Sequence, residues 1–107
     1  MKAIINGKRY DTETAVNIGE GGSHGSVSVN DFRYWSAGLY RSPRAGLYFL
    51  AGEGGPMTRF SRSTGQNSWQ GGEKIIPLTP EEALEWAEQF LTTREVEEHF
   101  GDIIEEA

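Results

Sequence analysis

The most regular pattern of hydrophobic and polar positions lies near the C-terminus. Thr79-Pro80-Glu81-Glu82 has the form of a helix start, because the threonine can cap, proline suits the first helical position, and Glu82 completes a capping box. The apolar residues that follow recur at the spacing of one helical face: Ala83, Leu84, Ala87, Phe90 and Leu91. This pattern predicts a helix over residues 80–91.

A second amphipathic segment begins after Thr92 or Thr93. Its apolar side consists of Val96, Phe100, Ile103 and Ile104. Gly101 lies within this segment and either ends the helix or breaks it partway. We therefore expect two successive helices at the C-terminus.

The N-terminal residues predict a hairpin followed by a short helix. A small apolar strand precedes Asn6-Gly7, the dipeptide that best fits a two-residue hairpin turn, so residues 2–10 are expected to form the hairpin. Asp11 can then cap a helix over residues 12–19. Residues 19–26 contain four glycines and are expected to form a flexible connection without regular structure.

The middle of the chain is rich in aromatic residues that favour strands. Residues 32–41 and 47–52 predict two antiparallel strands, joined by a turn that contains Pro43 and Gly46. Gly38 interrupts the first strand and indicates a bulge. Residues 73–78 predict a further strand, which Pro77 either confines to a sheet edge or ends.

These elements define an α+β fold within a single domain over residues 1–107. We expect a small antiparallel sheet of three to five strands packed against the two C-terminal helices, with a short N-terminal helix beside it. Residues 80–107 form an acidic helical part of this domain.

Charge is distributed unevenly along the chain, whose net charge is −6. Residues 81–107 contain ten acidic residues and a single base, Arg94, and carry −9, whereas residues 1–80 carry +3. Such asymmetry acts on the choice of partner more than on the fold. An acidic segment of this kind repels nucleic acid and attracts a basic protein surface.

Composition also narrows the cellular setting. The longest apolar run, residues 47–51, is far shorter than the roughly 20 residues that a membrane-spanning helix needs. The N-terminus turns polar too soon for a signal peptide. The chain has no cysteine, which excludes disulfides, thiolate metal ligands and cysteine nucleophiles and fits a reducing cytoplasm. We expect a cytoplasmic protein without membrane association.

No motif in the sequence indicates catalysis, a cofactor or a metal. The two histidines, His24 and His99, have no second ligand at a metal-binding spacing, although Glu95 and His99 can share one helix face. The glycine runs at residues 19–22 and 52–55 lack the phosphate-loop pattern, and we interpret them as turns with positive φ. We expect no catalytic residues, metal or cofactor; an enzyme that uses His24 or His99 is a further alternative.

Another alternative is a small nucleic-acid-binding or toxin–antitoxin-type module that uses the aromatic hairpin. Arginines alternate there with aromatic residues, as in proteins that bind single strands: Arg33, Arg41, Arg44, Arg59 and Arg62, with Phe32, Tyr34, Trp35, Tyr40 and Phe60. The acidic net charge argues against direct binding. We favour the interpretation that these aromatic residues build the core.

The glutamates of the two helices are the preferred candidates for a binding site. Seven of them occur within eighteen residues, with only Arg94 nearby: Glu81, Glu82, Glu85, Glu88, Glu95, Glu97 and Glu98. Like charges at i, i+4 destabilise a helix, so a solvated row of glutamates lowers the stability of the helix that carries it. Rows of carboxylates can imitate nucleic-acid phosphates, and we interpret these residues as the surface that binds a basic partner protein.

Three stretches of the sequence resemble a known family. They are residues 4–15 (IINGKRYDTETA), residues 52–56 (GEGGP), and residues 67–69 with 72–79 (NSW and GEKIIPLT). The chain resembles, over most of its length, small proteins carried by bacterial chromosomes, phages and other mobile elements, some of which are anti-CRISPR inhibitors. The resemblance implies a non-enzymatic inhibitor that binds a Cas effector in the cytoplasm of the host bacterium and blocks nucleic-acid binding or cleavage. It supplies no catalytic residues and leaves the effector and the oligomeric state open.

Overall fold

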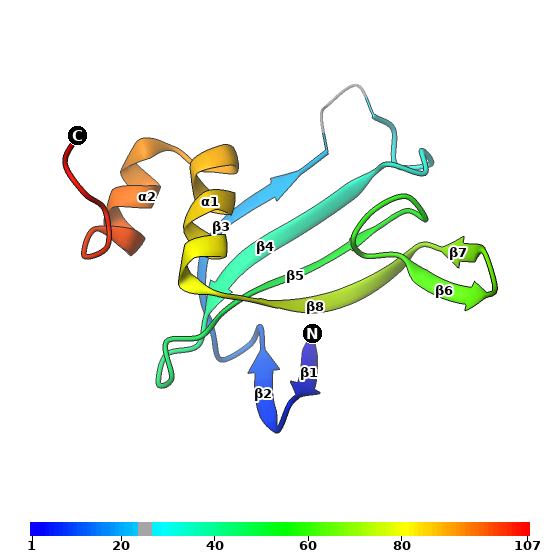
Figure 1. The fold of residues 1–107 in the computed structure, drawn as a ribbon, viewed down its shortest axis with the longest axis horizontal. Coiled ribbons are helices and arrows are strands. Elements are labelled where there is room, and N and C mark those ends of the chain that lie inside the picture. Colours follow the sequence, from blue (N-terminus) through cyan, green and yellow to red (C-terminus); the bar gives the residue numbers. More distant parts are fainter. Residues whose placement is uncertain (24–26) are drawn as a thin grey trace.

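A four-stranded antiparallel sheet organises the chain in the computed structural model, which describes residues 1–23 and 27–107 (Figure 1). The strands are β3 (Val16–Gly22), β4 (Trp35–Arg41), β5 (Tyr48–Gly54) and β8 (Gly72–Leu78), in the order β3-β4-β5-β8. Helices α1 (Pro80–Phe90) and α2 (Thr93–Phe100) follow. The predicted α+β class, the antiparallel sheet and both C-terminal helices are therefore confirmed.

Each helix starts where its capping residues place it. The Thr79 hydroxyl accepts the Glu82 N–H at 3.1 Å, and the Glu82 carboxylate accepts the Thr79 N–H at 2.8 Å. Thr92 and Glu95 repeat this arrangement at the start of α2. Gly101 ends α2, so Ile103 and Ile104 lie beyond the helix and are exposed. Reciprocal capping satisfies backbone donors that the helix itself leaves unpaired.

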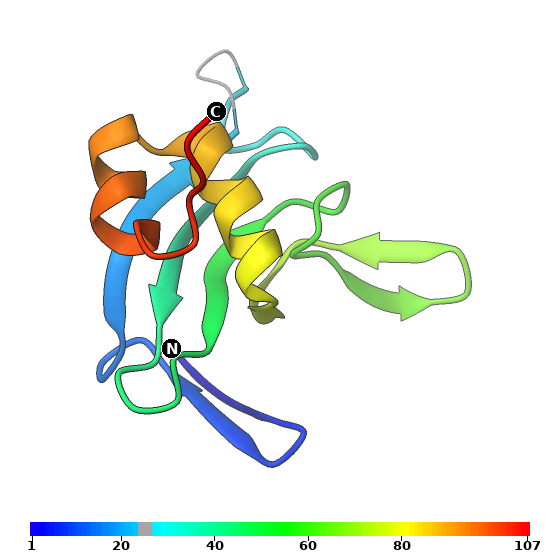
Figure 2. The same cartoon turned by 60° about the vertical axis from the view of Figure 1, so that its left-hand side comes forward.

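Both helices cover one face of the sheet (Figure 2). The core between the helices and the sheet is apolar throughout: Ile18, Leu39, Leu50, Ala83, Trp86, Ala87, Val96 and Phe100. Leu39 and Leu50 face each other in the β4–β5 register, and β8 supplies Ile76 next to Leu50. This layer buries most of the large side chains, as expected for a sheet covered by helices on one side.

The opposite face of the sheet has its own small core. The hairpin of β1 (Lys2–Ile5) and β2 (Lys8–Asp11) packs there, and Tyr10 meets Phe49 edge to face at 5.3 Å between ring centroids. Asn6 and Gly7 form its turn with φ of 51° and 77°, which confirms the predicted Asn-Gly hairpin.

The predicted short helix over residues 12–19 is wrong. Asp11 does cap, because its carboxylate accepts the Glu13 N–H at 2.9 Å, but it caps only a turn. The chain then enters β3 at Val16 and pairs with β4. Strand pairing satisfies the backbone of this segment and brings Ile18 into the helix-side core, which local helix propensity cannot match.

The glycine runs are also strands rather than turns. Residues 19–22 belong to β3 and residues 52–54 to β5, and none of these glycines has positive φ. Ser23 follows β3 as a bend, and the rest of the predicted flexible connection, residues 24–26, lies outside the described residues. Glycine occurs here because neighbouring groups approach the backbone closely: a Cβ on Gly52 would lie 2.5 Å from the Cβ of Ala37.

The strand bulge lies in β3 and not at Gly38. The β3–β4 register passes from Asn17 opposite Tyr40 to Gly19 opposite Leu39, so Ile18 is the extra residue, whereas β4 pairs with β5 without a shift. Pro77 lies on β8 at the edge of the sheet, as predicted.

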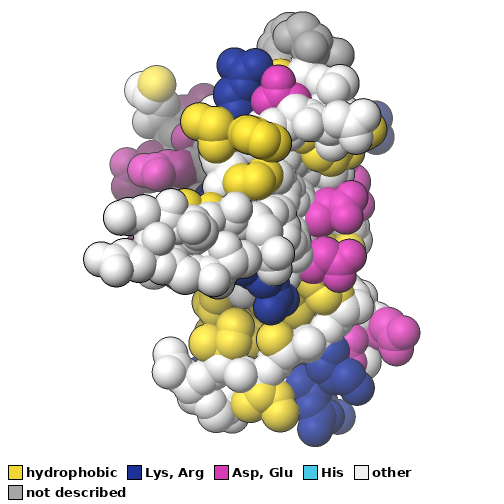
Figure 3. Space-filling view, turned by 90° about the vertical axis from the view of Figure 1, so that its right-hand side faces the viewer, with side chains coloured by type: hydrophobic (Ala, Val, Ile, Leu, Met, Phe, Trp, Pro, Cys, Tyr) yellow, Lys and Arg dark blue, Asp and Glu magenta, His cyan; other side chains and the backbone are white. Residues whose placement is uncertain are grey.

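A second hairpin projects from the body as an arm. It consists of β6 (Arg62–Gly65) and β7 (Ser68–Gln70), and all its strand residues are exposed. Figure 3 shows the arm as a surface almost free of charge. Trp69 lies on β7 and is 59% exposed.

Candidate functional site

Glutamates line the exposed side of α1. Glu81, Glu85 and Glu88 follow one another at spacings of four and three residues, so they lie on one helical face, and all three are exposed. On α2, Glu97 and Glu98 are exposed as well. These five carboxylates take no part in a hydrogen bond within the described part of the chain. We call them the acidic helix surface.

The two remaining predicted site residues hold the helix starts. The Glu82 carboxylate is bound by the Thr79 N–H. The Glu95 carboxylate accepts both the N–H and the hydroxyl of Thr92, each at 3.0 Å. These hydrogen bonds lower the pKa of Glu95 below 4.5, and the nearby His99 contributes least. Glu82 and Glu95 therefore have a structural role that the sequence analysis noted only for Glu82.

Arginines of the sheet do not neutralise the acidic helix surface. Over residues 1–23 and 27–107, the only ion pair with an N···O distance of 4.0 Å or less joins Arg33 and Asp31. Arg59, in the loop that follows β5, lines a hollow of about 180 Å³ together with Glu82 and Glu85 but forms no ion pair with them. The negative charge of the helices is therefore directed largely at solvent.

Most aromatic residues of the Arg-rich segment are part of the core. Phe60 is fully buried, Tyr40 stacks on Phe49 at 5.4 Å, and Trp35 packs edge to face against Phe90 of α1 at 5.1 Å. Five aromatic residues were candidates for stacking on the bases of a single-stranded nucleic acid. Of these, Phe32 is the one that is largely exposed. A row of bases has no continuous stacking platform on this surface.

A basic cleft at the other end of the molecule was missed by the sequence analysis. Lys8 and Arg9 of β2 line it together with Arg44 of the β4–β5 turn, around a hollow of about 590 Å³. Lys and Arg side chains gather at the lower end of the face in Figure 3, where the β1–β2 hairpin lies. Lys8 and Arg9 are neighbours in sequence, whereas Arg44 follows 35 residues later, so only the folding of the hairpin against the sheet brings Arg44 beside them.

Of the two histidines, only His99 belongs to the described residues. His24 falls within residues 24–26, which lie outside them. His99 is half-buried on α2, four residues after Glu95. In the part of the chain that is described, no three side chains of His, Asp or Glu come together as a metal site would require.

Membrane insertion through a helix has no support in the described residues. Neither α1 nor α2 is long and apolar enough to cross a bilayer.

Comparison with known proteins adds no relative: no family model, curated protein or solved structure matches this chain.

Proposed function

We propose that this chain is a non-enzymatic inhibitor that binds a basic, nucleic-acid-binding surface of a bacterial protein through the acidic helix surface. A Cas effector in the bacterial cytoplasm is the first partner to test, because the sequence resembles small phage and mobile-element proteins that include anti-CRISPR inhibitors. The observation that carries the proposal is the absence of a cation within 4.0 Å of the helix glutamates among the described residues.

The spacing of the carboxylates supports imitation of nucleic acid. Along a helix axis, Glu81 and Glu85 are separated by about 6 Å, and Glu85 and Glu88 by about 4.5 Å, at 1.5 Å per residue. Phosphates of one DNA strand follow at about 3.4 Å along the duplex axis, which is of the same order. A channel lined with Lys and Arg that tracks phosphates can therefore also contact this row.

Electrostatics also explains why the row can persist. The mutual repulsion of the three glutamates costs stability in the free protein, and a cationic partner relieves it on binding. Such attraction accelerates association at low ionic strength and weakens as salt is added.

The test is a triple substitution of Glu81, Glu85 and Glu88 to Gln, assayed on purified, guide-loaded Cas effectors. The readouts are inhibition of DNA cleavage and affinity at several salt concentrations. If each lost contact is worth about 1 kcal/mol, affinity falls roughly 100-fold at low salt, and the affinity of the native chain decreases with added salt.

A matched control changes Glu13, Glu53 and Glu73 to Gln. These residues are exposed, lie outside the helices and alter the net charge by the same amount. The control is expected to keep its affinity. Equal losses in both triple variants, or inhibition that is insensitive to salt, contradict the proposed surface. Absence of binding to every effector tested contradicts the Cas partner.

The basic cleft favours one second candidate function, direct binding of RNA or single-stranded DNA. Lys8, Arg9 and Arg44 present three cations around one hollow, which suits contact with phosphates. In a filter-binding assay at low salt, substitution of all three by Gln would abolish this binding, whereas the triple Glu-to-Gln variant would strengthen it. The two candidate functions thus respond in opposite directions to removal of the helix charges.

A further inference from the structure

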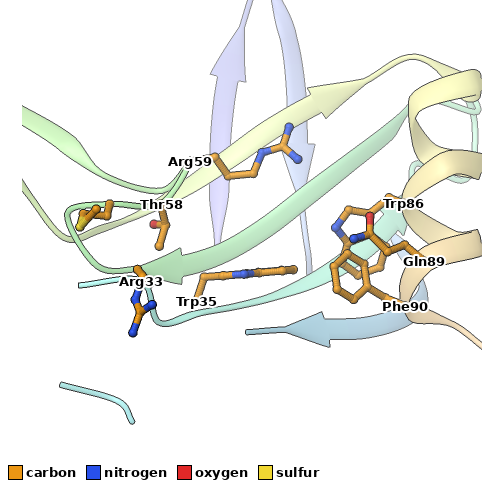
Figure 4. Close-up of a pocket in the computed structure, with 8 residues that line it drawn as sticks. Arg33, Trp35, Thr58, Arg59, Trp86, Gln89 and Phe90 are labelled. Carbon is orange, nitrogen blue, oxygen red and sulfur yellow. The ribbon is translucent and has the colours of Figure 1, made fainter. Parts of the chain in front are cut away.

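A groove with an aromatic floor lies between α1 and the loop that follows β5. Its volume is about 340 Å³, and its lining includes Arg33, Trp35, Met57, Arg59, Gln89 and Phe90. Figure 4 shows Trp35 lying along the sheet side of this groove, with Gln89 and Phe90 projecting from α1 at its end. We call it the Trp35 groove; it takes no part in the acidic helix surface.

The floor of the groove is fixed by ring contacts. The Trp35 indole meets Phe90 edge to face at 5.1 Å and an interplanar angle of 85°, and it stacks on Phe60 with the ring centroids 6.2 Å apart. The ring centroids of Trp86 and Phe90, both on α1, are 4.8 Å apart. These contacts join β4 to the helix and hold an apolar surface of constant shape.

The loop that forms the opposite wall is held by hydrogen bonds. The Met57 N–H donates to the Phe32 carbonyl at 2.9 Å, and the Thr58 hydroxyl donates to the Gly55 carbonyl at 2.8 Å. A wall that is already ordered loses little conformational entropy when something docks against it. The groove is therefore preformed.

Apolar surface continues beyond the groove. Met57 is 69% exposed, and Phe32, whose carbonyl accepts the Met57 N–H, is 63% exposed. A small molecule that fills the groove leaves Phe32 in water. A segment of polypeptide with one side chain in the groove can cover both residues, as interfaces with a buried apolar anchor do.

One arginine of the groove is available to an anion. Arg33 is occupied, because its Nε and Nη2 each donate to the Asp31 carboxylate at 3.0 Å. Arg59 is exposed and has no carboxylate within 4.0 Å among the described residues. In Figure 4 the Arg59 side chain extends on the same side of the groove as Thr58 and towards α1, whereas Arg33 points away. If the docking polypeptide carries a carboxylate near its apolar side chain, Arg59 is the cation that this carboxylate contacts.

From this arrangement we infer that the Trp35 groove binds an extended segment of a protein partner that carries a large apolar side chain and an acidic residue one or two positions away. The apolar side chain lies on Trp35 and Phe90, and the carboxylate contacts Arg59. This site adjoins the acidic helix surface, because Arg59 also lines a hollow with Glu85, but it requires a negatively charged ligand where that surface requires a positive one.

The test follows the indole N–H signals of the full chain by NMR during titration with synthetic peptides. The probe is an amidated Gly-Ser peptide with Asp and Trp two positions apart; two comparison peptides replace the Asp by Asn or the Trp by Ala. We expect the Trp35 and Trp86 signals to shift, while Trp69, on the projecting arm, serves as an internal control.

Arg59→Gln and the Asn peptide are each expected to weaken binding about fivefold to tenfold, the effect of one lost charge-assisted hydrogen bond. Combined, they are expected to weaken it little further, because both remove the same contact. Arg44→Gln, a change of the same charge outside the groove, leaves affinity unchanged. The Ala peptide is expected not to shift Trp35 or Trp86.

Three results overturn the inference. The first is the absence of any shift of Trp35 and Trp86 at millimolar peptide. The second is full affinity of Arg59→Gln for the Asp peptide. The third is that indole-3-acetate binds as tightly as the peptide, which would assign the groove to a small aromatic acid. Glu81, Glu85 and Glu88 do not line this groove, although Glu85 shares a neighbouring hollow with Arg59. The peptide titration uses no Cas effector, so failure of the proposed function and failure of this inference are distinguishable.

Discussion

The indole ring of Trp86 on α1 lies directly on the backbone of Gly21 in β3. A Cβ built on Gly21 would stand 2.7 Å from Cζ2 and 2.8 Å from Cη2 of that ring, and 3.0 Å from Cγ of Phe90. Trp86 is only 7% exposed and is held among core side chains, so it has little room to move aside. Glycine at position 21 therefore sets how closely the helix approaches the sheet.

Replacing Gly21 with Ala is expected to destabilise the protein by about 1–3 kcal/mol, because overpacking displaces a buried ring. Urea denaturation monitored by circular dichroism measures the loss. The double variant with Trp86→Leu is expected to lose less than the sum of the two single changes, since the smaller side chain leaves room for the new methyl group. A Gly21→Ala variant as stable as the native chain would show that the ring does not press on β3.

The two capping threonines are expected to contribute similarly to stability. Thr79→Ala and Thr92→Ala each remove a hydroxyl that accepts a helix N–H, and each should cost about 1 kcal/mol in urea denaturation. Thr92→Ala should also raise the pKa of Glu95, because the hydroxyl that donates to its carboxylate is lost. Thr93→Ala, a change one residue further on, serves as the control and should have little effect.

The Asp31–Arg33 pair gives a measurable pH dependence. Hydrogen bonds from Arg33 lower the pKa of Asp31 from 3.8 to about 2, so the carboxylate is favoured in the folded state. The contribution of the pair to the free energy of unfolding is complete above pH 3.8 and is lost as the pH falls towards 2. NMR titration of the Asp31 carboxyl carbon should show the low value, and Arg33→Gln should return it towards 3.8. An unchanged titration in that variant would contradict the pairing.

Repulsion among the helix glutamates predicts that salt stabilises the free protein. Added salt screens Glu81, Glu85 and Glu88 from one another, so the melting temperature should rise between about 20 mM and 500 mM NaCl. The triple Glu-to-Gln variant should melt slightly higher at low salt, by the equivalent of about 0.5 kcal/mol, and should respond less to salt. The control triple variant at Glu13, Glu53 and Glu73 removes one like-charge pair of its own, because Glu53 and Glu73 face each other in the β5–β8 register, but it should keep the part of the salt response that comes from the helix glutamates.

The glutamates of α1 could be grouped from the sequence, whereas the residues of the Trp35 groove could not. Glu81, Glu85 and Glu88 share a face because helix periodicity alone puts them there, so a sequence pattern suffices to group them. The Trp35 groove joins a strand residue to Phe90 and to a loop residue, Arg59, across the packed layers. The sequence spacing of these residues has no period that could have grouped them in advance.

Local chemistry determined the elements whose hydrogen bonds close within a few residues. The capping box at Thr79, the amphipathic pattern of α1 and the Asn6-Gly7 turn are of this kind, and the sequence alone was enough to place them. Tertiary structure decided residues 16–22. Pairing with β4 and the ring of Trp86 above Gly21 convert a segment with weak local preference into a strand, because non-local contacts outweigh propensities of less than about 1 kcal/mol per residue.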